Sequence, residues 1–323
     1  MRAGASPLLT VPFALLALAS VLALWAPLGW PFELFSHFRP QYAASALLLA
    51  MLFGWRRSPR WAFAALALGA WHGLPVVQRA LADAPAASSC SAAEFGVVTA
   101  NVQYVNGRPA PFLEWLAAQP ADLVVVQELS PGWAAALEAL PRYPYRHFIV
   151  RSDAYGNGVL SRWPLEQVEA VDLGRDGRPS LSGVAVVGGQ RVRFYGMHAR
   201  WPILPALARS RDEALARLAA LVRSDDLPVV VLGDLNLSPD SPVFARLLGA
   251  SGLRDALQGP HWRPTWMAGF WPLALRIDHV LVNDGLCVEG TAVGGAIGSD
   301  HRPVSARLRL RAPAAAVAAG AGA

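Results

Sequence analysis

The hydrophobic positions of the chain follow two patterns, and the change lies near residue 80. Before it, apolar residues run almost without interruption, and residues 8–30 form a nearly uncharged stretch that is long enough to cross a bilayer. Two shorter apolar stretches follow at residues 42–55 and 61–77. We therefore predict a transmembrane region over residues 1–80, with about three helical spans at residues 8–30, 38–55 and 61–78.

A compact basic loop, residues 56–60 (Arg-Arg-Ser-Pro-Arg), separates the last two apolar stretches. Basic loops between spans stay on the cytoplasmic side of the membrane. With three spans, everything after residue 77 then lies in the periplasm or outside the cell. The middle stretch is short, and if it does not span, the rest of the chain lies in the cytoplasm instead. Arg2 before an apolar run also fits a signal peptide, but the two further apolar stretches argue against that.

Beyond residue 80, short apolar runs alternate with helical or loop segments. Residues 81–93 are rich in Ala, Pro and Ser, which is typical of a linker. A domain follows over residues 94–311, and we predict that the low-complexity tail, residues 312–323, is disordered. The predicted strands are residues 95–100, 123–126, 158–160, 183–187, 192–195, 229–232 and 277–282, and the predicted helices are residues 111–119, 131–140 and 205–222. This mixture predicts an α/β (α+β) domain with helices over a core of sheet.

Composition changes this picture only slightly. The chain is 54% hydrophobic and 16% charged, too apolar for an ordinary soluble enzyme, but the excess lies in the first 80 residues. The net charge is +5, and every basic residue is Arg, which fits either phosphate affinity or a compositional bias of the gene. The two cysteines, Cys90 and Cys287, have no CxxC spacing, so the pattern argues against a structural zinc site.

The most informative stretch is residues 229–239, an apolar run that ends in Gly233, Asp234 and Asn236. It is typical of a buried strand that delivers polar groups at its carboxyl end. On an extended backbone, Asp234 and Asn236 project from the same face. A carboxylate beside an amide suits a substrate oxygen or a hard cation better than a core. The alternative is a strand that ends in an ordinary Asx-turn.

Other predicted strands also have polar residues at or near one end. Asn101, Glu128, His198 and Asp278 occupy such positions, and residues 299–301 (Ser-Asp-His) follow a glycine-rich loop. Any one of them could serve a turn, but together they suggest a common rim with an active site. Glu128 directly follows Val-Val-Val-Gln, where a buried carboxylate needs a cation or a donor.

One reaction, hydrolysis of a phosphodiester, would use all of these groups. It needs a hard cation, an activated water and stabilisation of developing negative charge. Mg²⁺ keeps several waters and needs few carboxylates, so Glu128 is the natural ligand. His301 would act as base or phosphate contact, with its imidazole held by Asp278. Asp234 could position the water or bind metal, and two amides, Asn236 and Asn101, could donate hydrogen bonds to phosphate.

Seven segments in this order resemble the motifs of the endonuclease/exonuclease/phosphatase superfamily, which has the DNase I-like fold. They are Thr99-Ala-Asn101-Val, Val126-Gln-Glu128-Leu, Gly156-Asn157-Gly-Val-Leu-Ser161-Arg162, Met197-His198, Gly233-Asp234-Leu-Asn236, Arg276-Ile-Asp278-His279 and Gly298-Ser299-Asp300-His301. The resemblance covers the whole domain after the linker. It implies a four-layer α/β/β/α sandwich of DNase I type and a divalent metal, usually Mg²⁺, with Mn²⁺ as an alternative.

The resemblance also implies roles for individual residues. Glu128 is expected to bind the metal, with Asn101 beside it and Asp300 as a second metal contact. His301 is expected to be the catalytic histidine, oriented by Asp278. Asp234 and Asn236 are expected to be the water-activating and phosphate-binding pair. The expected phosphate or substrate contacts are His198, Asn101 and Arg200. Two departures, His198 itself and Gln103, count against the abasic-endonuclease branch.

The expected function is a membrane-anchored, metal-dependent phosphoesterase, similar to bacterial membrane-anchored members of the superfamily. Its substrate would be a lipid headgroup, a nucleic acid or a small phosphoester. The alternatives are an extracytoplasmic nuclease acting on DNA or RNA, and an inactive binding module. Aromatic residues in loops 200–202 and 261–271 could stack on bases, enter a membrane interface or pack on the domain.

The predicted topology also bears on the cysteines, because disulfides persist outside the cytoplasm. Cys90 precedes the first strand of the domain, and Cys287 follows the strand that contains Asp278. We expect a disulfide between them that ties the linker to the sheet; the alternative is two unrelated cysteines. The sequence leaves the oligomeric state open.

Overall fold

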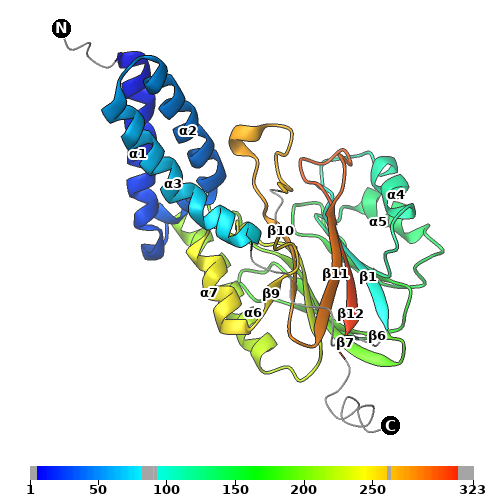
Figure 1. Ribbon diagram of the computed structural model, residues 1–323. Coiled ribbons are helices and arrows are strands. Elements are labelled where there is room, and N and C mark those ends of the chain that lie inside the picture. The colour runs from blue at the N-terminus through cyan, green and yellow to red at the C-terminus, as the bar shows by residue number, and fades with distance from the viewer. Residues whose placement is uncertain (1–5, 82–89, 91–92, 260–262, 312–323) are drawn as a thin grey trace, which may run out of the picture.

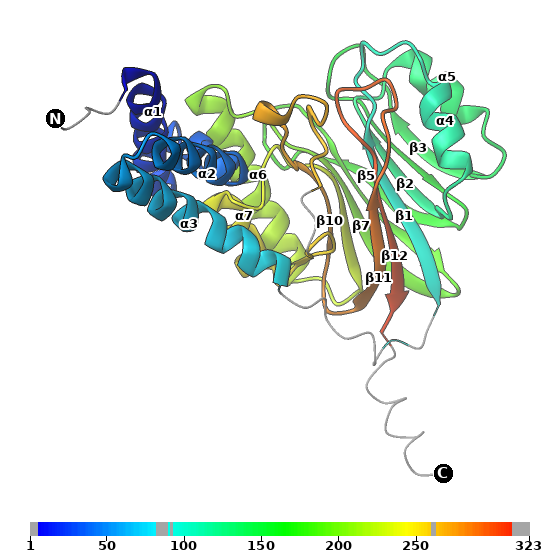
Figure 2. The same cartoon turned by 45° about the horizontal axis from the view of Figure 1, so that its top comes forward.

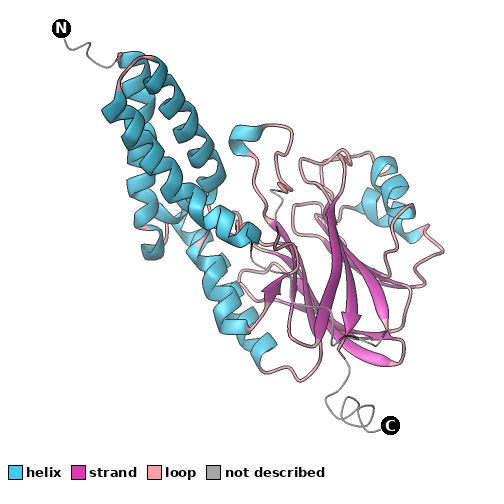
Figure 3. Cartoon of the chain, in the orientation of Figure 1, coloured by secondary structure: helices cyan, strands magenta, loops and turns pink. Residues whose placement is uncertain are grey.

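The computed structural model describes residues 6–81, 90, 93–259 and 263–311. Most of the predicted linker, the predicted disordered tail (residues 312–323) and residues 260–262 of the aromatic loop lie outside the described residues. Within the described part, an N-terminal helical bundle stands beside a β-sandwich (Figures 1 and 3).

The sandwich consists of two six-stranded sheets that pack face to face. The first has the strand order β11 (Leu286–Val293), β12 (Val304–Leu310), β1 (Glu94–Asn101), β2 (Leu123–Gln127), β4 (Asn157–Ser161) and β3 (Tyr145–Ile149). The second has the order β5 (Leu165–Val171), β6 (Ser180–Val187), β7 (Gln190–His198), β8 (Val229–Asp234), β10 (Asp278–Val282) and β9 (Arg254–Asp255). Apolar side chains from both sheets, such as Val125, Phe194 and Leu232, form one continuous core.

Helices cover the two outer faces of the sandwich (Figure 2). Helices α4 (Ala110–Ala117) and α5 (Pro131–Glu138) pack on the first sheet through Phe112, Leu116 and Trp133. Helices α6 (Pro205–Arg223) and α7 (Pro242–Ser251) pack on the second sheet. The predicted four-layer α/β/β/α sandwich is therefore confirmed.

Several elements of the sandwich were not predicted from the pattern. They are strands β3, β5, β9, β11 and β12 and helix α7. Strand β5 is half exposed and has a shifted register against β6, so its apolar positions do not alternate regularly. The start of α7 has a local signal, since the Ser241 hydroxyl accepts a hydrogen bond from the Val243 N–H (3.1 Å).

Strand direction brings the polar strand ends to one edge. Strands β1 and β2 run parallel, as do β7 and β8, so each pair ends at the same edge. Strand β10 is antiparallel to β8, with Asp278 opposite Asp234. Strand β12 is antiparallel to β1, so the loop that contains His301 enters at the edge where β1 ends. Residues from both sheets thus meet at one end of the sandwich.

The N-terminal region contains three α-helices: α1 (Pro7–Leu24), α2 (Arg39–Trp55) and α3 (Pro59–Leu81). The predicted first span, residues 8–30, was too long, because α1 ends at Leu24 and two 3-10 helices, η1 (Ala26–Leu28) and η2 (Phe32–Phe38), follow it. Among the described residues, only α1 combines the length and apolar composition of a membrane span, with a mean hydropathy of 2.2 over 18 residues. Figure 1 shows the α2–α3 turn at the end of the bundle remote from the sandwich.

Cys90 and Cys287 form a disulfide, with Cα atoms 6.3 Å apart. The bridge joins the segment before β1 to strand β11 of the first sheet. The expected pairing is therefore confirmed, and the alternative of two unrelated cysteines is excluded.

Candidate active site

Strands β7 and β8 approach each other closely where their polar ends begin. Gly233 has φ +152°, and a Cβ at this position would overlap the carbonyl oxygen of Met197. Only glycine tolerates both constraints. The parallel register then places His198 beside Asp234, with 3.6 Å between His198 Nε2 and Asp234 Oδ2.

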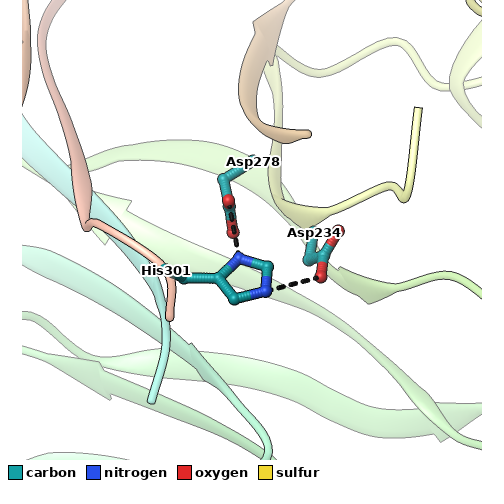
Figure 4. A group of neighbouring side chains, drawn as sticks. All are labelled: Asp234, Asp278 and His301. Carbon is teal, nitrogen blue, oxygen red and sulfur yellow. Dashed lines mark hydrogen bonds and ion pairs between the residues drawn. The ribbon is translucent and has the colours of Figure 1, made fainter. Parts of the chain in front are cut away.

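Two carboxylates flank the imidazole of His301 (Figure 4). Its Nδ1 donates a hydrogen bond to Asp278 Oδ2 (2.9 Å), and its Nε2 lies 3.7 Å from Asp234 Oδ2. Ser299 orients the histidine, because its hydroxyl accepts from the His301 N–H (3.0 Å) and donates to the Asn101 carbonyl (2.9 Å). His301, Asp234 and Asp278, which together we call the cluster, are all buried. The expected orienting role of Asp278 thus has the required geometry.

This geometry shifts the ionisation of the cluster. Burial alone would lower the pKa of His301, but the charge and hydrogen bond of Asp278 outweigh it and raise the pKa to about 10. Burial would raise the pKa of Asp278, but its contacts with His301 lower it. Burial and the charge of Asp278 raise the pKa of Asp234 to about 7. At neutral pH the cluster therefore holds a cationic imidazole beside a carboxyl that gains or loses a proton readily.

Glu128 lies directly after β2 in a strained backbone conformation, with φ +61°. Its Oε1 accepts from Asn101 Nδ2 (3.0 Å), and its Oε2 accepts from the Tyr104 N–H (3.0 Å). Left-handed backbone at a residue other than glycine costs energy and is concentrated at functional sites. The strain turns the carboxylate from the end of the strand into the site.

Asn101 lies beside the expected metal ligand, Glu128, and hydrogen-bonds to it. Its Oδ1 accepts from the Gln103 N–H (3.0 Å), so its amide nitrogen points at Glu128 and Asp234. The side chain therefore acts as a hydrogen-bond donor that holds two carboxylates in place.

Asn236 does not project from the same extended face as Asp234. The backbone turns after Asp234, and Asn236 has φ +50°. Its N–H donates to Asp234 Oδ1 (2.8 Å), which is the Asx-turn considered as the alternative, and its side-chain amide donates to the Ala199 carbonyl (2.9 Å). Asn236 still lines the site cavity.

Arg200 is not brought to the cluster. Its Nε donates to Asp176 Oδ2 (2.5 Å), and its guanidinium lies 5.2 Å from the centre of the Tyr155 ring. The Tyr155 ring also stacks on His198, with 5.5 Å between ring centres. Burial lowers the pKa of His198, so this imidazole is neutral at physiological pH.

The acidic residues of the site fit a divalent cation. Within the described part of the chain, neither Glu128 nor Asp300 forms an ion pair with an arginine; Asp300 Oδ2 accepts from the Trp266 indole N–H (2.9 Å). Potential ligand atoms of Asp234, Asp278 and His301 also lie within 4.8 Å of one another. In that group, however, Asp278 and His301 already hydrogen-bond each other. Glu128 and Asp300 offer further carboxylate oxygens, the ligands that hard cations prefer, in the same cavity.

These side chains open into one cavity of about 490 Å³. Its lining combines polar side chains, among them Glu128, Asp234 and His301, with apolar side chains such as Trp201, Ile203 and Leu273. The lining includes residues of the 3-10 helix η2 that were not predicted as part of a site: His37 and its neighbours Leu34 and Phe38. The available signal was the pair Glu33 and His37, two polar residues four apart in an otherwise apolar region. Tyr155 was also missed.

Comparison with known families explains this constellation. The model of the endonuclease/exonuclease/phosphatase family matches residues 98–301, which include Asn101, Glu128, Asp234, Asp278 and His301. This chain belongs to the endonuclease/exonuclease/phosphatase family. The expectation of a hydrolase acting on ester bonds is thereby confirmed. The chain is also 29% identical over 180 residues to the uncharacterized protein YbhP of Escherichia coli K12, covering 51% of this chain and 67% of that protein.

Solved structures of the family show the same fold. An endonuclease/exonuclease/phosphatase from Beutenbergia cavernae has 22% identity and a TM-score of 0.53, over 67% of this chain and 72% of its own. The 3′ phosphatase NExo from Neisseria, bound to a product DNA hairpin, has 24% identity and a TM-score of 0.55, over 66% and 98%. Sphingomyelinase C from Streptomyces griseocarneus has 23% identity and a TM-score of 0.52, over 67% and 99%.

Proposed function

We propose that the protein is a membrane-anchored, divalent-metal-dependent phosphoesterase that hydrolyses a phosphodiester or phosphomonoester. The observation that carries this proposal is the arrangement of His301 between Asp278 and Asp234, in one cavity with Glu128 and His198. A paired imidazole, an oxygen-ligand carboxylate and a carboxyl that titrates near neutrality are the groups that hydrolysis of a phosphate ester requires.

In this mechanism a water oxygen bonds to phosphorus, and the bond from phosphorus to one ester oxygen breaks. That oxygen keeps the bonding electrons and leaves as an alcohol after it gains a proton. Asp234 accepts the proton of the water, because its pKa of about 7 lets it ionise at neutral pH. His301, cationic and held by Asp278 through Nδ1, donates from Nε2 to a phosphate oxygen and stabilises its growing charge. His198 and Asn236 contact the same phosphate from the ends of β7 and β8.

Glu128 and Asp300 would hold the cation, with Mg²⁺ expected and Mn²⁺ as a substitute, and Asn101 fixes Glu128 by its amide hydrogen bond. The cation would supply positive charge opposite the oxygens of the phosphate. Both carboxylates line the site cavity, as this assignment requires.

The surface of the N-terminal bundle supports membrane anchoring. Of the 30 exposed large hydrophobic side chains in the described residues, 19 belong to residues 8–81. A three-helix unit that exposes Leu and Val outward in this proportion is suited to lipid and poorly suited to water. We infer that all three helices enter the membrane, with the basic loop at residues 56–60 in the cytoplasm and the catalytic domain outside.

The test uses the full chain in detergent with bis-p-nitrophenyl phosphate, in Mg²⁺ and in EDTA. Hydrolysis is expected in Mg²⁺ only, and Glu128→Gln and His301→Asn are each expected to lower kcat/KM at least about 100-fold. Glu114→Gln and His147→Asn, which alter the same residue types outside the cavity, serve as matched controls. Equal rates in EDTA, or unchanged rates in either site variant, would refute the assignment. Metal binding by calorimetry without turnover would favour the inactive binding module.

A further inference from the structure

The N-terminal region contributes part of the active-site wall. Helix η2 lies between α1 and α2, and Leu34, His37 and Phe38 line the same cavity as Asp234 and His301. Helix α2 begins at the next residue, Arg39. The cavity is therefore directly continuous with the end of the proposed membrane bundle.

Buried polar contacts hold η2 on the catalytic domain. Glu33 accepts from Ser241 Oγ (2.5 Å) and from Arg211 Nη2 (3.2 Å), and all three residues are about 1% exposed. His37 Nδ1 accepts from the Ser238 N–H (3.1 Å). Ser238 and Ser241 follow the catalytic strand β8. The wall is thus fixed to the loop that positions Asp234 and Asn236.

A second tie joins the bundle to the loop on the other side of the cavity mouth. Gln41, in the first turn of α2, donates from Nε2 to the Ala274 carbonyl (2.7 Å). Ala274 ends the short 3-10 helix η4 (Trp271–Leu273). Figures 1 and 2 show this orange segment standing beside α2.

The mouth of the cavity has an exposed apolar rim. We define the rim by the side chains of two loops: Trp201, Ile203, Leu204, Phe270, Trp271 and Leu273. Each of them is between 40% and 57% exposed. Trp201, Ile203 and Leu273 also line the cavity. Side chains of this kind are costly to expose to water but are suited to the interface of a membrane.

The lining argues against a nucleic-acid groove. Binding of a nucleic-acid strand depends on Lys and Arg along the path of the phosphates. Among the described residues that line the cavity there is no arginine, while Glu128, Asp234 and Asp300 are acidic. A single phosphate ester fits such a pocket, whereas a polyanion gains little from it.

We propose that the substrate is a membrane phospholipid, whose headgroup phosphate enters the cavity sideways from the leaflet while its acyl chains stay against the apolar rim and η2. This inference rests on the proposed function and names its substrate class. Water adds to phosphorus, one ester oxygen leaves as an alcohol after gaining a proton, and the other product keeps the phosphate. Only water is needed as co-reactant.

The experiment uses the full chain reconstituted in vesicles of phosphatidylethanolamine, phosphatidylglycerol and sphingomyelin in equal parts. Release of the headgroup, with or without its phosphate, is compared with hydrolysis of bis-p-nitrophenyl phosphate by the same sample. In the double variant Ile203→Ser/Phe270→Ser, the ratio of lipid to soluble-ester turnover is expected to fall at least about tenfold. Leu221→Ser, an exposed leucine on α6 outside the rim, is the matched control and should leave the ratio unchanged.

The outcomes separate the inference from the proposed function. Hydrolysis of the soluble ester without any lipid hydrolysis would overturn the inference alone. An unchanged ratio in the rim variant would also overturn it. Single-stranded DNA is assayed with the same samples, and turnover of DNA that is faster than that of lipid and is lost in the rim variant would assign the rim to base stacking instead. If no substrate is hydrolysed, both the proposed function and the inference that rests on it are refuted.

Discussion

At the scale of single residues, the imidazole of His301 meets two carboxylates with different ionisation. Asp278 is the direct hydrogen-bond partner and keeps a lowered pKa, whereas the pKa of Asp234 rises to about 7. The environment thus separates one carboxyl that orients the histidine from one that can act as a base. Because the three groups interact strongly, a rate profile reports pKa values of the cluster.

The first prediction concerns this profile. A base must be deprotonated, so kcat/KM for bis-p-nitrophenyl phosphate should rise with pH through about 7, the pKa of Asp234. It should fall again near pH 10, where His301 loses its proton. In Asp278→Asn the group that raises the pKa of His301 is lost, so the alkaline limb should move to lower pH and kcat should fall about 100-fold or more. An alkaline limb at the same pH in this variant as in the wild type would show that Asp278 does not raise the pKa of His301.

The carboxylates of the site were predictable because each lies at or near the end of a strand that has an obvious apolar pattern. Glu128, Asp234 and Asp278 are of this kind. The orientation of Asn236 was not predictable, since it depends on a turn with positive φ. The contact of His37 with the catalytic domain was not predictable either, because its partner Ser238 lies 201 residues away in the sequence.

At the scale of elements, the least predictable feature is η2. Its seven residues lie between two apolar helices, and the pattern placed all of them except Phe38 between the predicted spans 8–30 and 38–55, with no structure assigned to them. The contacts of Glu33 explain why the segment packs on the catalytic domain. Burial would raise its pKa, but His37, Arg211 and Ser241 together lower it to about 2. An ionised, fully paired carboxylate needs the catalytic domain as its partner.

The second prediction tests this contact. Glu33→Gln should reduce the free energy of unfolding at pH 7 by about 3 kcal/mol, because the buried Arg211 loses a charged partner. The folded pKa of about 2 lies below the ordinary 4.5, so the stabilisation is present above pH 4.5 and is lost as the pH falls toward 2. Denaturant unfolding at pH 7 and pH 3 should therefore show a smaller difference between wild type and variant at pH 3. The control is Glu114→Gln; an equal difference at both pH values would contradict the prediction.

At the scale of the whole molecule, the disulfide and the bundle concern the same question, the side of the membrane on which the domain lies. The sequence allows the domain to lie on either side of the membrane, because the middle apolar stretch, residues 42–55, is short for a spanning helix. In the structure α2 and α3 pack antiparallel and share a core with α1, which includes Leu16, Phe53 and Ala65. The ends next to the domain are those after α1, before α2 and after α3 (Figure 1). If all three helices cross the membrane, as proposed above, the basic turn lies on the side opposite the domain.

The last prediction follows from this arrangement. If the domain lies outside the cytoplasm, Cys90 and Cys287 are oxidised in cells, and a maleimide reagent labels neither until a reductant is added. In the background Cys90→Ser/Cys287→Ser, a membrane-impermeant maleimide should label Ser152→Cys from outside the inner membrane but reach Arg60→Cys only after lysis. Loss of the bridge, which closes a loop of sequence separation 197, should also lower the free energy of unfolding by about 2–4 kcal/mol. Free thiols in the wild type, together with the reverse labelling pattern, would place the catalytic domain in the cytoplasm, and the rim would then face the inner leaflet.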